Sequence, residues 1–264
     1  MQDRGFSSAL LPLAGFFAIG RAVFRLLRLS AETQARSVLG WMTGAAVVDN
    51  ARQVKRGDGN VEFTAGDVEL TSDIPVYQGF FTFSTLKYRH RRFDGSWSEE
   101  VTREVHEHHD AVGVLLYDPA ADAVVLVEQV RAGIVARRDG TTPWVLEVVA
   151  GLIDTDETPE QVGRREVWEE AGCHIDEMIP LYSFYPSPGC YTERVHLYCA
   201  LLDSSAVGGV HGLAEEQEDI RVHVISFPKA MQLLEEGKLD NGMMVIAMQW
   251  LARERASLRA RSNG

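Results

Sequence analysis

The sequence predicts an α/β fold in which a mixed β-sheet lies between helices, preceded by a small N-terminal β region. Three observations predict it. Apolar runs of strand length recur from residue 77 onward, a capped helical segment occupies residues 158–172, and apolar residues at helical spacing close the chain. This order of elements, with strands first, one helix in the middle and further helices at the end, is typical of a sheet covered by helices. The 264 residues are 45% hydrophobic and 24% charged, an ordinary globular composition.

The charge and the cysteine content exclude several classes of protein. The net charge is −12, and the body of the chain contains no run rich in Lys and Arg, which argues against a nucleic-acid partner. An acidic enzyme acting on an anionic substrate would need a cation between them. The three cysteines have no paired spacing, so we expect reduced thiols in the cytoplasm rather than disulfides or a thiolate zinc site. They are Cys173, Cys190 and Cys199.

Residues 1–55 form an N-terminal extension with an unusual composition. The segment Ser8–Leu29 is strongly apolar but contains three arginines, and its uninterrupted run, Ala9–Gly20, is 12 residues long. A transmembrane helix needs roughly 20 residues. An amphipathic helix on a membrane surface is one interpretation. We favour a poorly ordered extension, or upstream sequence translated from a misplaced start with Met42 as a later candidate, and therefore no membrane partner.

Strand patterns fill the next part of the chain. Residues 77–93 alternate aromatic with polar side chains before the turn sequence DGS, which predicts a β-hairpin in an N-terminal β region at 56–106. Residues 111–131 are two β-branched runs around DPAAD and predict a second hairpin, and residues 144–151 predict a further strand. Later strands are expected at 180–186, 194–202 and 220–226. Helices are expected from about 228 to 237 and from 241 onward.

A helix between these strands carries explicit start and stop signals. Thr158 is a good N-cap, Pro159 suits the first helical position, and Gln161 completes a capping box. Gly172 is placed to end the helix in the left-handed conformation. The spacing therefore predicts a helix over residues 159–171.

Three glutamates of this helix repel one another. Glu166, Glu169 and Glu170 lie at i, i+3 and i+4, so they share one face of the last two turns. Like charges at this spacing destabilise a helix by roughly 0.2–0.5 kcal/mol per pair, and acid near a C-terminus opposes the helix dipole. A hard divalent cation such as Mg²⁺, which prefers oxygen ligands, would turn this repulsion into binding. The alternative is an acidic face that is simply solvated.

The acidic helix is part of a longer pattern. Gly151 is followed after five residues by Glu157, and after seven more by Arg165-Glu166-Val167-Trp168-Glu169-Glu170-Ala171-Gly172-Cys173. This spacing resembles the Nudix box at every polar and glycine position, with Cys173 where the family usually has an aliphatic residue. The resemblance implies a Nudix hydrolase domain over 107–264, folded as an α/β/α sandwich with a mixed sheet, in which the box forms a strand, a loop, a helix and a loop.

Other segments narrow the resemblance. Pro188 lies fifteen residues past Cys173, where a proline marks the ADP-ribose pyrophosphatases of the family. The segments at 79–81 (GFF), 89–104, 211–224 and 235–241 also resemble the bacterial members. This implies Mg²⁺-dependent hydrolysis of ADP-ribose to AMP and ribose 5-phosphate. Hydrolysis of another nucleoside diphosphate sugar, such as GDP-mannose, stays open. A non-catalytic domain that senses ADP-ribose is the third interpretation, although such regulators commonly lose box glutamates that are intact here.

The resemblance also implies roles for individual residues in catalysis. The family's general base lies on a loop outside the box, and the matching residue is Glu216, with Glu218 as the alternative. Glu169 would support the metal cluster as a third catalytic glutamate of the helix. The residues implied to hold Mg²⁺, or Mn²⁺ in its place, are Ala150 (through its carbonyl), Glu166, Glu170 and Glu216.

Structural and substrate-binding roles follow from the same resemblance. Arg165 would orient box carboxylates such as Glu157, and Gly151 and Gly172 would shape the box. Arg131 resembles the arginine that holds the pyrophosphate, a task that suits a guanidinium. In this group the N-terminal residues reach the site of the other subunit, which implies a homodimer. The implied substrate-binding residues are Phe80, which would stack on adenine, Arg103, Glu104, Arg131, Gly151, Pro188 and Glu193.

Overall fold

The computed structural model describes residues 59, 61–175 and 177–262. The N-terminal extension at 1–55, including Ser8–Leu29, lies outside the described residues. The chain divides into two compact units, Met1–Glu62 and Phe63–Gly264, and every element described below belongs to the second. No helix in the described part of the chain combines the length and the apolar character needed to cross a membrane.

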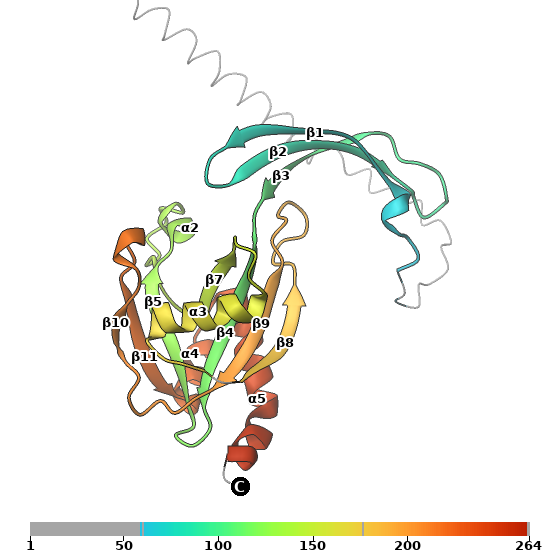
Figure 1. Cartoon of the computed structure of the whole chain (residues 1–264). Coiled ribbons are helices and arrows are strands. Elements are labelled where there is room, and N and C mark those ends of the chain that lie inside the picture. Colours follow the sequence, from blue (N-terminus) through green and yellow to red (C-terminus); the bar gives the residue numbers. More distant parts are fainter. Residues whose placement is uncertain (1–58, 60, 176, 263–264) are drawn as a thin grey trace, which may run out of the picture. The chain divides into compact units, whose positions relative to one another are not determined.

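The first sheet has three antiparallel strands in the order β1-β2-β3 (Figure 1). They are β1 (Val68–Gln78), β2 (Thr82–His90) and β3 (Val101–Glu107), preceded by a short 3-10 helix, η1 (Ala65–Asp67). The hairpin turn falls at residues 79–81, within the segment expected to be one continuous strand. The DGS sequence turns the chain between the antiparallel strands β2 and β3, as predicted, and Asp94 there accepts a hydrogen bond from the amide of Ser96 (2.9 Å).

The second sheet is mixed, as the sequence predicts. Its strand order is β10-β11-β5-β4-β9-β8, with β6 paired to β5 and β7 paired to β4. The pair β4–β9 is parallel and the other pairs are antiparallel. The strands are β4 (Asp110–Asp118), β5 (Ala123–Val130), β6 (Trp144–Glu147), β7 (Val149–Ile153), β8 (Met178–Phe184), β9 (Val195–Leu201), β10 (Gly209–His211) and β11 (Ile220–Ser226).

Helices cover both faces of this sheet (Figure 1). On one face, α3 (Pro159–Ala171) packs Val162, Val167 and Ala171 against alternate residues of β4 and β5. On the other, α4 (Phe227–Glu235) and α5 (Gly242–Ser262) enclose a second core. Two short helices, α2 (Ala132–Val135) and η2 (Ala214–Glu216), lie in loops. The two apolar layers confirm the predicted sandwich.

The ends of α3 confirm the predicted caps. The Thr158 hydroxyl accepts a hydrogen bond from the amide of Gln161 (3.3 Å), and the Gln161 side chain accepts one from the Thr158 amide (2.8 Å). Gly172 ends the helix with a positive φ of 66°. Because both ends are fixed locally, the helix presents its glutamates in a defined register toward β7.

Candidate active site

The strand β7 runs directly beneath the acidic face of α3. Gly151 pairs with Val112 of β4, and a β-carbon at Gly151 would lie 2.1 Å from Oε1 of Glu166. No larger residue fits there unless the Glu166 side chain moves. The glycine that opens the box therefore lets the first glutamate of the helix lie against the strand.

Glu170 is the most deeply buried of the three helix glutamates, with 3% of its surface exposed. Its Oε2 accepts a hydrogen bond from the amide of Ala150 (3.2 Å) and its Oε1 accepts one from Nε2 of Gln129 (3.3 Å). Burial raises the pKa of Glu170 to about 8, and the charge of Glu166 adds to this, while the Ala150 amide and Arg131 act in the opposite direction. The carboxylate is thus held in place by strands on two sides.

Glu166 experiences the charge of its neighbours as well as burial. Burial raises its pKa to about 7; Glu169 and Glu218 raise it further, whereas Arg165 lowers it. The influence of Glu218 is informative because this residue belongs to the loop after η2, far from the box in sequence. The segment between β10 and η2 is tied to α3 by a hydrogen bond from the Gly212 amide to the Glu169 carbonyl (3.1 Å).

Arg165 binds three carboxylates of the box. Its Nε lies 3.2 Å from Oε2 of Glu157, and its Nη1 lies 2.8 Å from Glu166 and 3.1 Å from Glu169. The pairing with Glu157 is the contact that the resemblance implies. The guanidinium holds two of the helix glutamates in defined positions and offsets part of their repulsion.

The carboxylates fit a divalent cation by their chemistry. Glu166 raises the cost of ionising Glu170, and Glu169 and Glu218 raise that of Glu166; a bound cation would relieve this, and the carboxylate oxygens are the hard donors that Mg²⁺ prefers. Among the described residues, no three acidic, histidine or cysteine side chains converge closely enough to form a ready metal cage. Arg165 already pairs with Glu166 and Glu169 on this face.

The two candidates for the general base lie at the end of η2. Glu216 is exposed and is the last residue of η2, and Gln217 follows in the left-handed conformation (φ 59°). Glu218 turns back, and its Oε2 accepts a hydrogen bond from the amide of Leu213 (3.1 Å). Of the two, Glu218 is the one whose charge acts on Glu166.

Arg131 lies between two acidic groups. Its Nε donates to Oε2 of Glu147 at 2.5 Å, and its charge also lowers the pKa of Glu170. The arginine side chain is 39% exposed, whereas that of Glu147 is 8% exposed. The Arg131 guanidinium is therefore held by the buried Glu147 carboxylate and remains accessible to solvent beside the carboxylate cluster.

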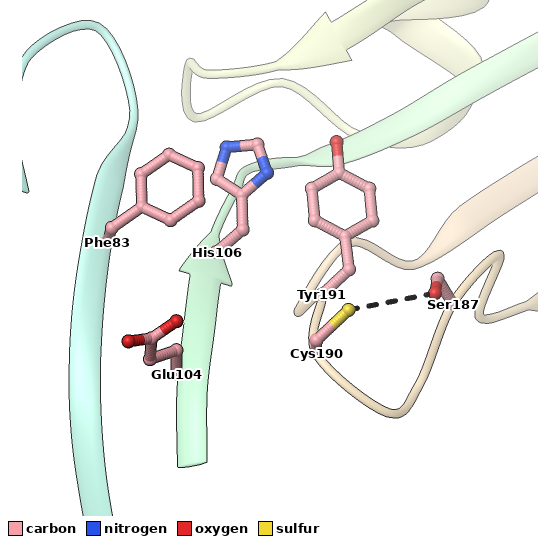
Figure 2. Close-up of a pocket in the computed structure, with 6 residues that line it drawn as sticks. All are labelled: Phe83, Glu104, His106, Ser187, Cys190 and Tyr191. Atoms are coloured by element: carbon pink, nitrogen blue, oxygen red, sulfur yellow. Dashed lines mark hydrogen bonds between the residues drawn. The ribbon is translucent and has the colours of Figure 1, made fainter. Parts of the chain in front are cut away.

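A pocket of about 480 Å³ lies where β3 meets the loop between β8 and β9. Figure 2 shows the rings of Phe83, His106 and Tyr191 following one another along its wall, with the Ser187–Cys190 contact at the far side. The Phe83 and His106 rings are stacked (4.4 Å between centroids, 4° between planes), and Tyr191 lies 4.8 Å from His106. The pocket residues are Phe83, Glu104, His106, Ser187, Cys190 and Tyr191.

The structure gathers some of the substrate-binding residues implied by the sequence and leaves others apart. Glu104 lines the pocket, and Pro188 belongs to the same loop as Ser187. Glu193, at the end of this loop, lies 3.4 Å from Nδ1 of His108. Phe80, by contrast, is 77% exposed and packs edge-on against Phe81.

Arg103 also lies outside the pocket, where its Nη1 donates to the carbonyl of its neighbour Thr102 (2.7 Å). Sequence reasoning missed Phe83, His106 and Tyr191 as pocket residues. Phe83 and His106 face each other across β2 and β3, and His106 forms a bridge with Tyr191. Alternation along each strand was visible in the sequence, but the register that brings the rings together was not.

Comparisons with known proteins show the family to which the chain is similar. A sequence model of the NUDIX domain matches residues 107–245. The ADP-ribose pyrophosphatase of Escherichia coli (strain K12) is 45% identical over 199 residues, which cover 75% of this chain and 94% of that protein. The ADP-ribose pyrophosphatase of Haemophilus influenzae is 43% identical over 197 residues (74% and 91%). The GDP-mannose pyrophosphatase of Klebsiella pneumoniae is 33% identical over 187 residues (70% and 91%).

The fold has a counterpart among solved structures. The crystal structure of an ADP compounds hydrolase superposes with a TM-score of 0.54 at 16% sequence identity, covering 71% of this chain and 96% of that one. This likeness confirms the mixed α/β fold. Nudix hydrolases generally use a divalent metal ion, in keeping with the carboxylates on α3. The match over more than half of the chain and the identity to these relatives show that the chain belongs to the Nudix family.

Proposed function

We propose that this protein hydrolyses the pyrophosphate of ADP-ribose, giving AMP and ribose 5-phosphate. The observation that carries the proposal is the intact set of box glutamates on α3, held by Arg165 and β7 beside Arg131. The relatives at 43–45% identity, which bear the name ADP-ribose pyrophosphatase, support the choice of substrate.

Different residues have different roles in this reaction. A Mg²⁺ ion, or Mn²⁺ in its place, held by Glu166, Glu170 and the Ala150 carbonyl, would act as a Lewis acid on the phosphoryl oxygens. Arg131 pairs with the pyrophosphate and stabilises the negative charge that develops during transfer. Glu216 accepts the proton of the attacking water, with Glu218 as the alternative base.

The aromatic pocket receives one end of the substrate. A nucleobase stacks favourably on aromatic rings, and the pocket offers the rings of Phe83, His106 and Tyr191 with the Glu104 carboxylate at its edge. The carboxylate would accept a hydrogen bond from an amino group of the base. Phe80 and Arg103 lie outside the pocket of their own chain. We propose that they contact a second subunit instead.

Two alternatives to ADP-ribose hydrolysis differ in their support. The GDP-mannose pyrophosphatase relatives at 30–33% identity favour a second nucleoside diphosphate sugar as substrate. A sensing domain without catalysis would also need a nucleotide pocket, but it has no use for the buried glutamates of α3. We rank ADP-ribose first because the identity to its hydrolases is higher.

The assembly and the location follow the same reasoning. We propose a homodimer in which β1–β3 carry the subunit contact, since β1 exposes large apolar side chains along most of its length, including Leu70, Ile74 and Val76. The residues 56–106 thus serve dimerisation and substrate contacts, and 107–264 form the hydrolase domain. A cytoplasmic location fits the three cysteines, all of which are free thiols.

A substrate screen tests the proposed function. Purified protein with Mg²⁺ is given ADP-ribose, GDP-mannose and other nucleoside diphosphate sugars, and products are identified by mass. We expect AMP and ribose 5-phosphate from ADP-ribose at the highest kcat/KM. If GDP-mannose is hydrolysed at a higher kcat/KM than ADP-ribose, GDP-mannose is the preferred substrate. Binding of ADP-ribose without any turnover would support the sensing domain instead.

A further inference from the structure

A buried carboxylate outside the box lies beside the arginine that faces the active site. Glu147 is the last residue of β6 and is 6% exposed. Its only ion pair among the described residues is with Nε of Arg131, at 2.5 Å. Neither the box pattern nor the aromatic pocket accounts for this glutamate.

Strand register places Glu147 on the same side of the sheet as the catalytic helix. Glu147 pairs with Val127 of β5, and directly paired residues project from the same face. Val127 packs with Val162 and Val167 of α3, so that face is the one that α3 covers. Gln129, two residues further along β5, points the same way and contacts Glu170. The Arg131–Glu147 pair therefore borders the carboxylate cluster.

Burying this ion pair is not an efficient way to stabilise the fold. Burial raises the pKa of Glu147, and Asp240 adds to the effect, whereas Arg131 lowers the pKa. The ionised form thus depends on its arginine. An ion pair whose arginine remains 39% exposed to water gains only modest Coulomb energy. A role in function explains the pair better than a role in stability.

The geometry of the contact leaves the arginine free to act. Glu147 contacts Nε, the inner nitrogen of the guanidinium, and the arginine side chain is 39% exposed. A guanidinium fixed by one edge can present its remaining N–H groups to a second anion. Its charge already reaches Glu170.

We propose that Glu147 is a positioning residue that holds the Arg131 guanidinium in the orientation needed to bind the pyrophosphate of the substrate. This inference rests on the proposed function. It adds Glu147 to the residues that serve the reaction. Glu147 does not touch the substrate, because Arg131 lies between its carboxylate and the substrate. Fixing the arginine in advance avoids the entropy cost of ordering it in the transition state.

A double-mutant cycle tests the proposal. The variants are Glu147→Gln, Arg131→Ala and the double variant, and kcat and KM are measured with the nucleoside diphosphate sugar that the wild type hydrolyses best. We expect Glu147→Gln to lower kcat/KM about tenfold and Arg131→Ala about a hundredfold, with the double variant no worse than Arg131→Ala alone. The loss from Glu147→Gln should fall on kcat more than on KM, because phosphoryl charge develops in the transition state.

Glu128→Gln is the matched control. Glu128 lies on the neighbouring strand β5, its side chain is 28% exposed, and it contacts His223 (2.9 Å) and Arg221 (3.7 Å) rather than Arg131. We expect its kcat/KM to equal that of the wild type. The melting temperature of Glu147→Gln is measured beside kcat/KM, because removing one partner of an ion pair can also lower stability.

Two results would overturn the proposal. One is a wild-type kcat/KM for Glu147→Gln, and the other is a double variant whose loss equals the product of the two single losses.

If Glu147→Gln does not fold, the same cycle is run with Glu147→Asp, whose side chain keeps the charge but is shorter by one methylene. If the wild type cleaves a sugar nucleotide other than ADP-ribose, the proposed function fails while the cycle still decides the role of Glu147. If it cleaves ADP-ribose and the losses multiply, only the role of Glu147 fails.

Discussion

Gly151 and Glu166 approach each other so closely that a single methyl group on the glycine would overlap the carboxylate of the glutamate. A β-carbon added to Gly151 would lie 2.1 Å from Oε1 and 2.5 Å from Cγ of Glu166. The atoms in the way are the far end of a flexible side chain rather than backbone. The contact thus constrains where the Glu166 carboxylate, a proposed metal ligand, can lie.

Gly151→Ala should therefore move Glu166 and weaken the metal site. We expect the Mg²⁺ concentration for half-maximal activity to rise by about tenfold, a size typical of changes that displace a metal ligand. The melting temperature without metal should change little. The control is Gly242→Ala, since Gly242 has no heavy atom within 4 Å of a β-carbon. An unchanged Mg²⁺ requirement would show that Glu166 does not bind the metal from this position.

Activity should require an added divalent metal ion. The acidic face of α3 has cationic help on its own helix only from Arg164 and Arg165, and Glu170 is buried without an ion pair of its own among the described residues. Metal-stripped protein in excess EDTA should not turn over ADP-ribose, and Mg²⁺ should restore activity and raise the melting temperature by mass action. Full turnover in EDTA would contradict the metal hypothesis.

The metal-free protein should lose stability as the pH rises. The folded pKa values of about 7 for Glu166 and about 8 for Glu170 lie above the ordinary value of 4.5. The folded state therefore binds protons more tightly than the unfolded state. The stability gained from these protons is complete below pH 4.5 and is lost as the pH rises through 7 and 8.

Thermal melts in EDTA between about pH 4.5 and 8 measure this loss, and Mg²⁺ should oppose it most at the highest pH, because the metal replaces the protons. The matched comparison is Glu170→Gln, which removes one of the two titrating groups and should flatten the decline. Equal slopes for the wild type and Glu170→Gln would assign the pH dependence to other groups.

Glu216→Gln should keep the fold and substrate binding and lose turnover. The amide is nearly isosteric but is a far weaker base, and loss of a general base typically costs roughly 10²- to 10⁴-fold in rate. The loss should appear in kcat more than in KM. Glu218→Gln is the control, and it matters because Glu218 is the residue whose charge reaches Glu166. A wild-type kcat for Glu216→Gln beside a low one for Glu218→Gln would make Glu218 the base.

The protein should be a homodimer in solution. The strand β1 is at the edge of its sheet and exposes several large apolar side chains, which a second copy would cover. Light scattering should give twice the chain mass. Leu70→Lys and Ile74→Lys together should shift the protein toward the monomer and lower activity. Removal of residues 1–50 is the control and should leave the dimer and its activity intact. A fully active monomer would contradict the prediction.

Features that depend on neighbouring residues could be predicted from the sequence alone. Thr158, Gln161 and Gly172 define the two ends of α3 because capping is decided within one turn of a helix. The box spacing placed Glu166, Glu169 and Glu170 on one face for the same local reason. The β-branched runs predicted the strands of the central sheet, including β11 at residues 220–226 without error.

Features that depend on strand register were decided only by the tertiary structure. The Arg131–Glu147 pair joins the residue that follows β5 to the last residue of β6, and the pocket joins Phe83, His106 and Tyr191 from three separate segments. A register shift of one residue would turn each of these side chains to the opposite face. Such a shift would leave the alternation of polar and apolar residues along each strand unchanged. The sequence therefore contains the residues of the site, but the packing of the sheets determines which of them come into contact.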